Sequence, residues 1–187
     1  MENLNQNTLR DVSDHVNDSI RRLSGVAELF ELIGRHPEEL IQYKSFITSL
    51  IDVYSRDAVN CFSNLLDEKR GTSSMFRLVE AVEDDVLRKQ FLTKIKDLKK
   101  TAKDLLIVRG GKIGHFSIKA NTFKNNSLPV NVDIQLDPNY ITSRLEKLEA
   151  IYWELKEILG IDGVFMVWTG NPVEEFKKMI QNLRGQD

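Results

Sequence analysis

The residues of this chain best suited to catalysis lie in the stretch VRGGKIGHFS at 108–117, where an arginine precedes a histidine by six positions. The guanidinium of Arg109 could hold a phosphate and stabilise the charge that develops during phosphodiester cleavage. The imidazole of His115 titrates near neutral pH and could accept or donate a proton. On an uninterrupted helix these side chains would stand about 120° apart around the axis. Three glycines within the stretch accept unusual backbone angles, which would allow the two groups to converge on one anion.

A structural interpretation of the same stretch also stands. Gly110 and Gly111 could form the C-terminal turn of a helix, with Arg109 as a cation at its carbonyl end and His115 without a role. The string RGGKIG lacks the glycine spacing and the following Ser/Thr of a phosphate loop. One cysteine and three widely separated histidines give no zinc-binding spacing. The sequence therefore predicts no metal and no other cofactor.

Basic residues are concentrated around this stretch. From Arg88 to Lys124 there are eleven basic and two acidic side chains, a net charge of 11 − 2 = +9. The whole chain carries −2, so the remainder carries −2 − 9 = −11. A basic segment on an acidic body can bind phosphates locally while the rest of the surface repels nucleic acid. The alternative is a solvated helix face, because lysine is a good helix former.

The elements that must position these residues are predicted to be helices. Four stretches carry apolar residues at spacings of three and four, the pattern of an amphipathic helix. They cover residues 9–30, 47–65, 87–105 and 141–159, and a shorter helix is expected within 73–84. Pro37, Pro138 and Pro172 are predicted to begin helices, and Gly34 and Gly160 to end them.

One region departs from the helical pattern. Apolar and polar residues alternate near 116–136, which predicts a small extended or β-like excursion with a turn in its middle. The expected fold class is therefore all-α, an antiparallel helical bundle that carries this excursion. A length of 187 residues corresponds to one domain, 1–187.

Composition indicates the cellular compartment expected for the protein and whether it enters a membrane. Cys61 is the single cysteine, which excludes an intramolecular disulfide and fits a reducing cytoplasm. The polar first residues lack the apolar core of a signal peptide. The apolar run at 163–168 is far shorter than the ~20 residues of a membrane helix. We therefore expect a cytoplasmic protein that does not enter the membrane.

Other side chains that could carry chemistry have simpler interpretations. His15 and His36 are predicted to be surface or capping residues. The acidic run within 80–85 could bind a hard cation, although a solvated helix junction is the favoured interpretation. Trp153 and Trp168 are expected in the core or in an interface rather than as platforms for base stacking.

The order of several short motifs resembles a known family. YSRDAVNCFSNLLDEKRGTSSMFRLVE at 54–80, a lysine-rich helix and VRGGKIGHFS resemble the HEPN domains of the abortive-infection, AbiU-type, branch. That family has a helix ending in Leu-Leu-Asp, a Gly/Ser/Thr linker, two further helices, and then Arg and His separated by four to six residues. The matching residues here are Leu65–Asp67, Gly71–Ser74, Arg109 and His115. The resemblance spans about residues 25–120, and 137–187 forms a C-terminal helical extension.

The resemblance implies both a fold and an activity. It implies a HEPN-like all-α bundle that forms a homodimer and brings two Arg/His sets together in a cleft. It also implies metal-independent endoribonuclease activity in a toxin, phage-defence or stress system, with RNA as substrate and an antitoxin protein as a further partner. Arg109 would grip the scissile phosphate, and His115 would serve in acid–base catalysis on the 2′-hydroxyl pathway. The residues implied to contact the RNA backbone are Lys99, Lys100, Lys103 and Lys112.

Three positions of the motif differ from the common family pattern. Gly110, Gly114 and Ser117 stand where many members of the family have Asn, Ala and Asp. A non-catalytic HEPN-like module that binds nucleic acid or a protein partner is therefore the alternative. A purely structural interaction bundle is the third interpretation of the sequence.

Overall fold

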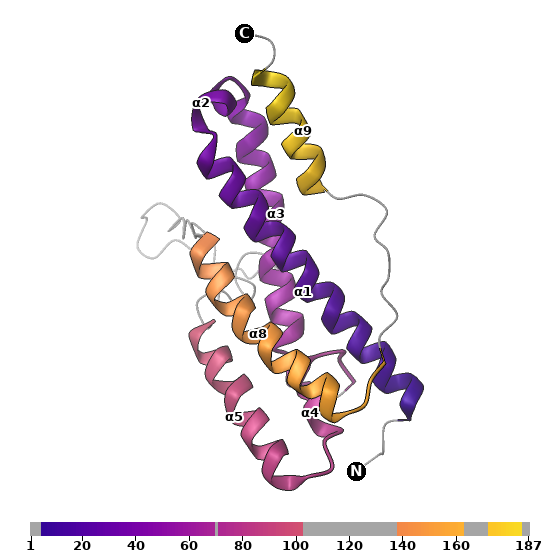
Figure 1. Ribbon diagram of the computed structural model, residues 1–187. Helices are drawn as coiled ribbons and strands as arrows, with labels where there is room; N and C mark the ends of the chain where they lie inside the picture. The colour runs from indigo at the N-terminus through magenta and orange to yellow at the C-terminus, as the bar shows by residue number, and fades with distance from the viewer. Residues whose placement is uncertain (1–4, 70, 103–137, 163–171, 185–187) are drawn as a thin grey trace, which may run out of the picture.

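The chain folds into an all-α bundle (Figure 1). The computed structural model describes residues 5–69, 71–102, 138–162 and 172–184, and every regular element within them is a helix. In chain order these elements are α1 (Gln6–Arg35), α2 (Pro37–Leu40), the 3₁₀ helix η1 (Ile41–Tyr43), α3 (Lys44–Leu65), α4 (Met75–Glu80), α5 (Asp85–Thr101), α8 (Pro138–Ile158) and α9 (Pro172–Arg184). The all-α prediction is confirmed, and the predicted excursion at 116–136 lies outside the described residues.

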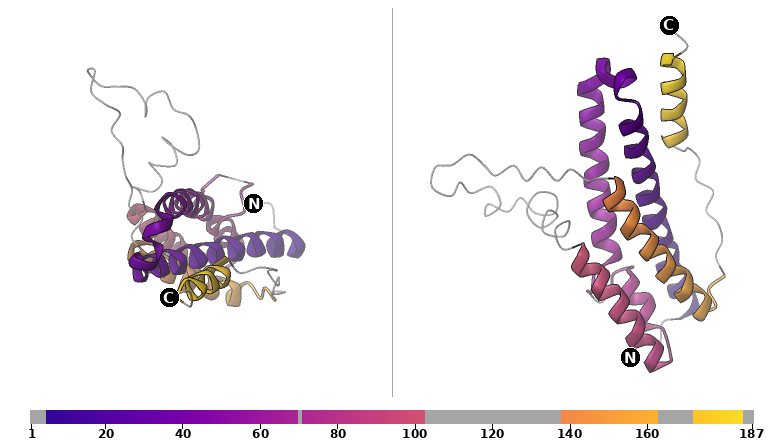
Figure 2. Two further views of the ribbon diagram at one scale, coloured as in Figure 1. Left: turned by 90° about the horizontal axis from the view of Figure 1, so that it is seen from above. Right: turned by 60° about the vertical axis from the view of Figure 1, so that its left-hand side comes forward.

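The long helix α1 is the centre of the bundle. It packs against α3 and α8 along its length and also contacts α4 and α9 (Figures 1 and 2). Asn5 caps its N-terminus, where the side-chain Oδ1 accepts a 2.8 Å hydrogen bond from the backbone N–H of Thr8. The predicted apolar stripe forms its buried face: Leu9, Val12, Val16, Ile20, Leu23, Ala27 and Phe30. One continuous stripe thus explains both the length of α1 and its central position.

Proline and glycine mark the helix ends, with one exception. Pro37, Pro138 and Pro172 are the first residues of α2, α8 and α9, as predicted. Gly34 was expected to end the first helix, but α1 continues through it and ends at Arg35. The stop comes from Pro37 instead, because a residue that precedes proline is disfavoured in the helical conformation.

Gly160 ends α8 as predicted. Its φ of 59° lies in the left-handed region, which glycine adopts without the steric cost of a Cβ atom. Its N–H donates to the carbonyl of Glu157 at 3.1 Å, and the N–H of Ile161 donates to the carbonyl of Lys156 at 3.1 Å. This pair of hydrogen bonds is the Schellman motif, which satisfies the last carbonyls of the helix.

The main hydrophobic core joins five of the described helices. Residues of α1, α3, α4, α5 and α8 form one contiguous buried cluster. Phe62 of α3 and Leu148 and Leu155 of α8 are completely shielded from solvent. Full burial of such side chains stabilises a fold by about 1.5–3 kcal/mol each. Helix α8 is therefore part of the same core as α1 and α3.

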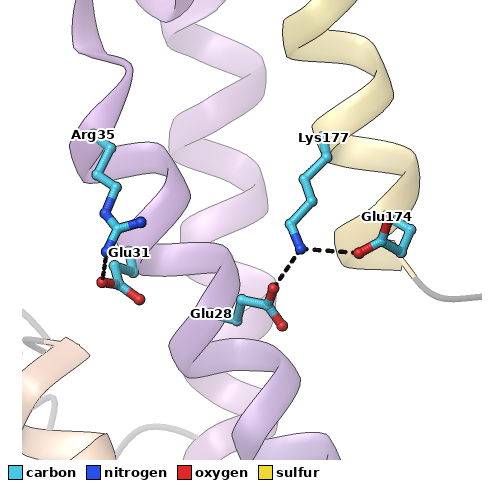
Figure 3. Close-up of polar contacts among 5 residues, drawn as sticks. All are labelled: Glu28, Glu31, Arg35, Glu174 and Lys177. Atoms are coloured by element: carbon cyan, nitrogen blue, oxygen red, sulfur yellow. Dashed lines mark hydrogen bonds and ion pairs between the residues drawn. The ribbon is translucent and has the colours of Figure 1, made fainter.

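Helix α9 covers a second, smaller cluster beside the C-terminal half of α1 (Figure 1). Its Phe176 and Ile180 are buried together with Leu29, Leu40 and Ile47. Figure 3 shows the polar contact at its edge, where Lys177 Nζ lies 2.7 Å from Glu28 Oε1 and 2.9 Å from Glu174 Oε1. Hydrogen bonds to Glu28 and then Glu174 raise the pKa of Lys177.

A neighbouring ion pair within α1 joins Arg35 to Glu31 (Figure 3). These three ion pairs are exposed, so the buried apolar residues provide most of the stabilisation of this region. Within the described ranges, no helix combines the length and the apolar character needed to cross a lipid bilayer.

Candidate functional site

Most of the predicted site lies in one stretch of the chain. Lys103, Arg109, Lys112 and His115 fall within 103–137, which is outside the described residues. Lys99 and Lys100, at the end of α5, are the predicted RNA-contacting residues that the structure describes. The described part of the predicted site is therefore the end of α5, together with the elements that contact this helix.

Described residues on the two sides of the segment 103–137 are joined by hydrogen bonds. The carbonyl oxygen of Thr101, the last residue of α5, accepts hydrogen bonds from Tyr140 Oη at 3.1 Å and from Arg144 Nε and Nη2 at 3.2 and 2.9 Å. The Arg144 guanidinium also lies 3.2 Å from the centre of the Tyr140 ring. Carbonyls at a helix C-terminus lack partners within the helix and attract cations. Arg144 thus connects the C-terminal end of α5 to the first turns of α8.

Lys99 is engaged in a contact between elements. Its Nζ lies 2.8 Å from Glu68 Oε1, in the segment between α3 and α4, and 5.5 Å from the centre of the Phe76 ring on α4. The Lys99 side chain is 32% exposed, whereas that of Lys100 is 77% exposed. The position of Lys99 is thus explained by packing between α5 and the end of α3, without an RNA ligand.

Acidic side chains pair with much of the described basic charge. Lys94 Nζ lies 2.5 Å from Glu154 Oε2 on α8, and Lys100 Nζ lies 2.9 Å from Asp97 Oδ1 on α5 itself. Arg88 pairs with Asp85 at the start of the same helix. Residues 88–102 carry six basic and one acidic side chain, a net charge of 6 − 1 = +5. Glu68 and Glu154 approach this charge from other elements and therefore lie outside the charge count for 88–124.

The Leu-Leu-Asp motif has a structural role in this bundle. Leu65 and Leu66 are each 1% exposed and belong to the main core. Asp67 turns the chain out of α3: its Oδ1 accepts from the N–H of Lys69 at 3.0 Å, and its carbonyl accepts from Ser74 Oγ at 2.7 Å. The linker that follows contains Gly71, whose φ of 85° favours glycine. Glu68, the residue that follows this motif, forms an ion pair with Lys99 of the lysine-rich helix.

The remaining candidate residues have structural explanations. His15 is exposed, and His36 lies between α1 and α2 as the cap of both helices, so both predictions are confirmed. Asp84 caps α5, with its Oδ1 accepting from the N–H groups of Val86 and Leu87 at 2.8 and 2.9 Å. This confirms the helix junction predicted for the acidic run. Among the described residues, no group of His, Cys, Asp or Glu is arranged to hold a metal ion.

Trp153 was expected in the core or in an interface, and its exposure excludes the core position. Trp153 lies on α8 and is 48% exposed, and the centre of its ring lies 5.0 Å from Lys156 Nζ. The neighbouring Tyr152 occupies the inward-facing position instead and is 2% exposed. Trp168 lies outside the described residues.

The structure also reveals polar contacts between helices that were not predicted from the sequence. Ser13 of α1 and Tyr152 of α8 are nearly inaccessible, and their hydroxyl oxygens lie 2.9 Å apart. Burial raises the pKa of Tyr152.

A second contact between helices lies beside the single cysteine. Arg22 of α1 pairs with Asp57 of α3, close to the buried thiol of Cys61. Burial, reinforced by the charge of Asp57, raises the pKa of Cys61 to about 12, so this thiol is not a reactive nucleophile at neutral pH.

No sequence signal identifies the Ser13–Tyr152 contact, because its two partners are 139 residues apart.

The chain was compared with protein-family models, with curated proteins and with solved structures, and nothing matches.

Proposed function

We propose that this protein is a HEPN-type, metal-independent endoribonuclease of a toxin, phage-defence or stress system. In this proposal Arg109 holds the scissile phosphate, and His115 acts as the acid–base group. The 2′-hydroxyl of the substrate loses its proton and attacks the neighbouring phosphorus, and the bond from phosphorus to the 5′ oxygen breaks. The leaving 5′ oxygen takes up a proton, so the products are a 2′,3′-cyclic phosphate and a 5′-hydroxyl.

One observation carries the proposal: the Leu-Leu-Asp motif, the linker, the lysine-rich helix and the Arg-x5-His stretch follow one another in the HEPN order. The bundle supports it in two respects. Its described part is all-α, as this resemblance requires. The residue that follows the first motif, Glu68, also forms an ion pair with Lys99 near the end of the lysine-rich helix.

A cleavage assay in the presence of EDTA tests the proposal directly. Single-stranded RNA is incubated with micromolar wild-type protein and with the Arg109→Ala/His115→Ala double variant. We expect cyclic-phosphate products from the wild type alone, with a rate that changes around pH 6 to 7, the ordinary range of a histidine pKa. RNA that stays intact, or equal cleavage by the double variant, would contradict the proposal. A rate that is flat from pH 5 to 9 would argue against His115 as the proton carrier.

The second candidate is a non-catalytic HEPN-like module that binds nucleic acid or a protein. The ion pair of Lys99 with Glu68 favours it, because it shows a structural use for one of the lysines predicted to contact RNA. This candidate predicts RNA binding that weakens steeply with salt and yields no product. If the folded protein does not bind RNA at low salt, a structural interaction bundle is the better description.

The proposal includes a homodimer and an antitoxin partner. A two-fold axis near residues 109–115 would bring two Arg/His sets into one cleft. Light scattering at micromolar concentrations should give twice the mass of one 21.5 kDa chain. A strictly monomeric protein would remove the composite cleft from the proposal, although cleavage by a single subunit could still be measured in the same preparation.

A further inference from the structure

Helix α5 presents one unshared face to solvent. It packs mainly against α4 and α8, and it lies at the outer edge of the bundle (Figures 1 and 2). Its buried residues are Phe91, Ile95 and Leu98, which define the side that faces the core. Within the described part of the chain, the opposite side is exposed.

Three lysines share this outer face. Lys89, Lys96 and Lys100 are separated by seven and four residues, which places them within about 40° of one another around the helix axis. All three are exposed. They extend over about 16 Å along the axis. We call Lys89, Lys96 and Lys100 the lysine ridge.

Ion pairing separates the lysine ridge from the other lysines of α5. Lys94 and Lys99 lie on the two flanks of the helix and are paired with Glu154 of α8 and Glu68 near α3. Lys89 and Lys96 form no ion pair with any residue of the described ranges. Two lysines thus bind the helix to its neighbours, while the outer face keeps its charge available.

Two acidic residues lie close to the lysine ridge. Asp97 is paired with Lys100, but the two side chains are 61% and 77% exposed, so this pair is weak and exchangeable. Asp85, one turn before Lys89, is paired with Arg88. Helix-dipole compensation accounts for Lys100 in the last turn of α5. It does not account for Lys89 or Lys96, because the dipole effect falls off within one turn of the helix end.

From this arrangement we propose that the lysine ridge of α5 binds the phosphates of an RNA strand. The inference rests on the proposed function and specifies which lysines contact the substrate. Lysine ammonium groups on a convex face are suited to phosphate binding without base recognition. Lys89 and Lys96 become RNA-binding residues, and Lys99 becomes a structural residue that joins α5 to the segment after α3.

The test compares two variants that lose the same charge from the same helix. Lys89→Gln/Lys96→Gln removes the unpaired lysines of the ridge, and Lys94→Gln/Lys99→Gln is the matched control. The probe is a fluorescein-labelled 2′-O-methyl uridine oligonucleotide, which the 2′-hydroxyl pathway cannot cleave. Anisotropy gives the Kd over a range of salt concentrations, and circular dichroism confirms that each variant is folded.

We expect the Kd of the ridge variant to rise about tenfold at low salt, with the slope of log Kd against log salt reduced by about 1.4. We expect the control to bind within about threefold of the wild type, because only the long-range field changes. Equal weakening in both variants, or unchanged binding in the ridge variant, would overturn the inference.

The proposed function can fail separately. If the wild type binds the oligonucleotide and cleaves unmodified RNA while the ridge variant is unaffected, the ribonuclease proposal stands and the ridge assignment is wrong. A wild type that neither binds nor cleaves would remove the proposed function itself. Displacement of the oligonucleotide by poly-glutamate as readily as by unlabelled RNA would instead indicate an acidic protein partner, and would overturn the assignment to RNA.

Discussion

The buried hydroxyl pair between α1 and α8 allows a sharp test of the packing in this bundle. Tyr152 Oη lies 2.9 Å from Ser13 Oγ and 3.3 Å from the Ser13 carbonyl oxygen, in a region where both residues are at most 2% exposed. The perturbation is a double-mutant cycle with Tyr152→Phe, Ser13→Ala and the combined variant. Tyr140→Phe is the control, since it removes a hydroxyl from the same helix whose partner, the Thr101 carbonyl, is exposed.

Burial sets the expected magnitudes. Tyr152→Phe leaves the Ser13 hydroxyl without its side-chain partner, which should cost about 1–2 kcal/mol of unfolding free energy. Ser13→Ala should cost about 0.5–1 kcal/mol, because the Tyr152 hydroxyl keeps the carbonyl as acceptor and alanine is the better helix former. The combined variant leaves neither hydroxyl, so it should lose less than the sum of the single changes. The coupling energy should be about 1 kcal/mol.

Urea unfolding followed by circular dichroism measures all four proteins, with the slope against urea checked for constancy. The Tyr140→Phe control should stay within about 0.5 kcal/mol of the wild type. If the two single changes are additive within about 0.3 kcal/mol, the two hydroxyls do not interact. The packing of α8 against α1 described above would then be wrong.

Three further predictions concern helix ends and the buried thiol. Arg144→Ala should lower the unfolding free energy by about 1–2 kcal/mol, because it removes two charge-assisted hydrogen bonds to Thr101; Arg144→Lys, which lacks the planar fork, should restore only part of it. Gly160→Ala should destabilise the protein by about 1 kcal/mol, because the φ of Gly160 is positive. Gly34→Ala should stabilise the protein, because Gly34 lies inside α1 and an added Cβ atom meets no other atom at either position. Equal effects of the two changes in thermal unfolding would contradict this prediction. The pKa of Cys61 is raised to about 12 in the folded protein, so the unfolded thiol ionises first as the pH rises above 9. Folding stability should therefore fall by up to about 1.4 kcal/mol per pH unit in that range, and Cys61→Ala should flatten the profile.

The ion pairs around α5 change how the basic segment is understood. A count along the chain suggests a uniform positive surface, whereas the fold assigns Lys94 and Lys99 to contacts with Glu154 and Glu68. Among the described residues, the lysines of α5 that form no ion pair with another element lie on one face of the helix. A mutational survey of RNA binding that treated all lysines of α5 as equivalent would average over these two classes.

Local physics explains why the helices themselves could be predicted. An apolar residue at every third or fourth position makes one face of a helix bury itself, and proline at a first turn costs no hydrogen bond. These rules act over a few residues, so the sequence alone placed the buried face of α1, the starts of α2, α8 and α9, and the Gly160 stop. The end of α1 was misplaced by one residue because the restriction that Pro37 imposes on His36 outweighs the preference for a stop at Gly34.

For the candidate site, the sequence determined which chemistry is available: a guanidinium, an imidazole and a surplus of lysines in one stretch. It could not determine which lysines are occupied, because their partners come from other elements. Glu68 and Lys99 are 31 residues apart, Lys94 and Glu154 are 60 apart, and Ser13 and Tyr152 are 139 apart. Such pairs are brought together only when the apolar faces of α1, α3, α5 and α8 pack into one core. Tertiary structure therefore decided which charges join the helices of the bundle and which form no ion pair within the described ranges.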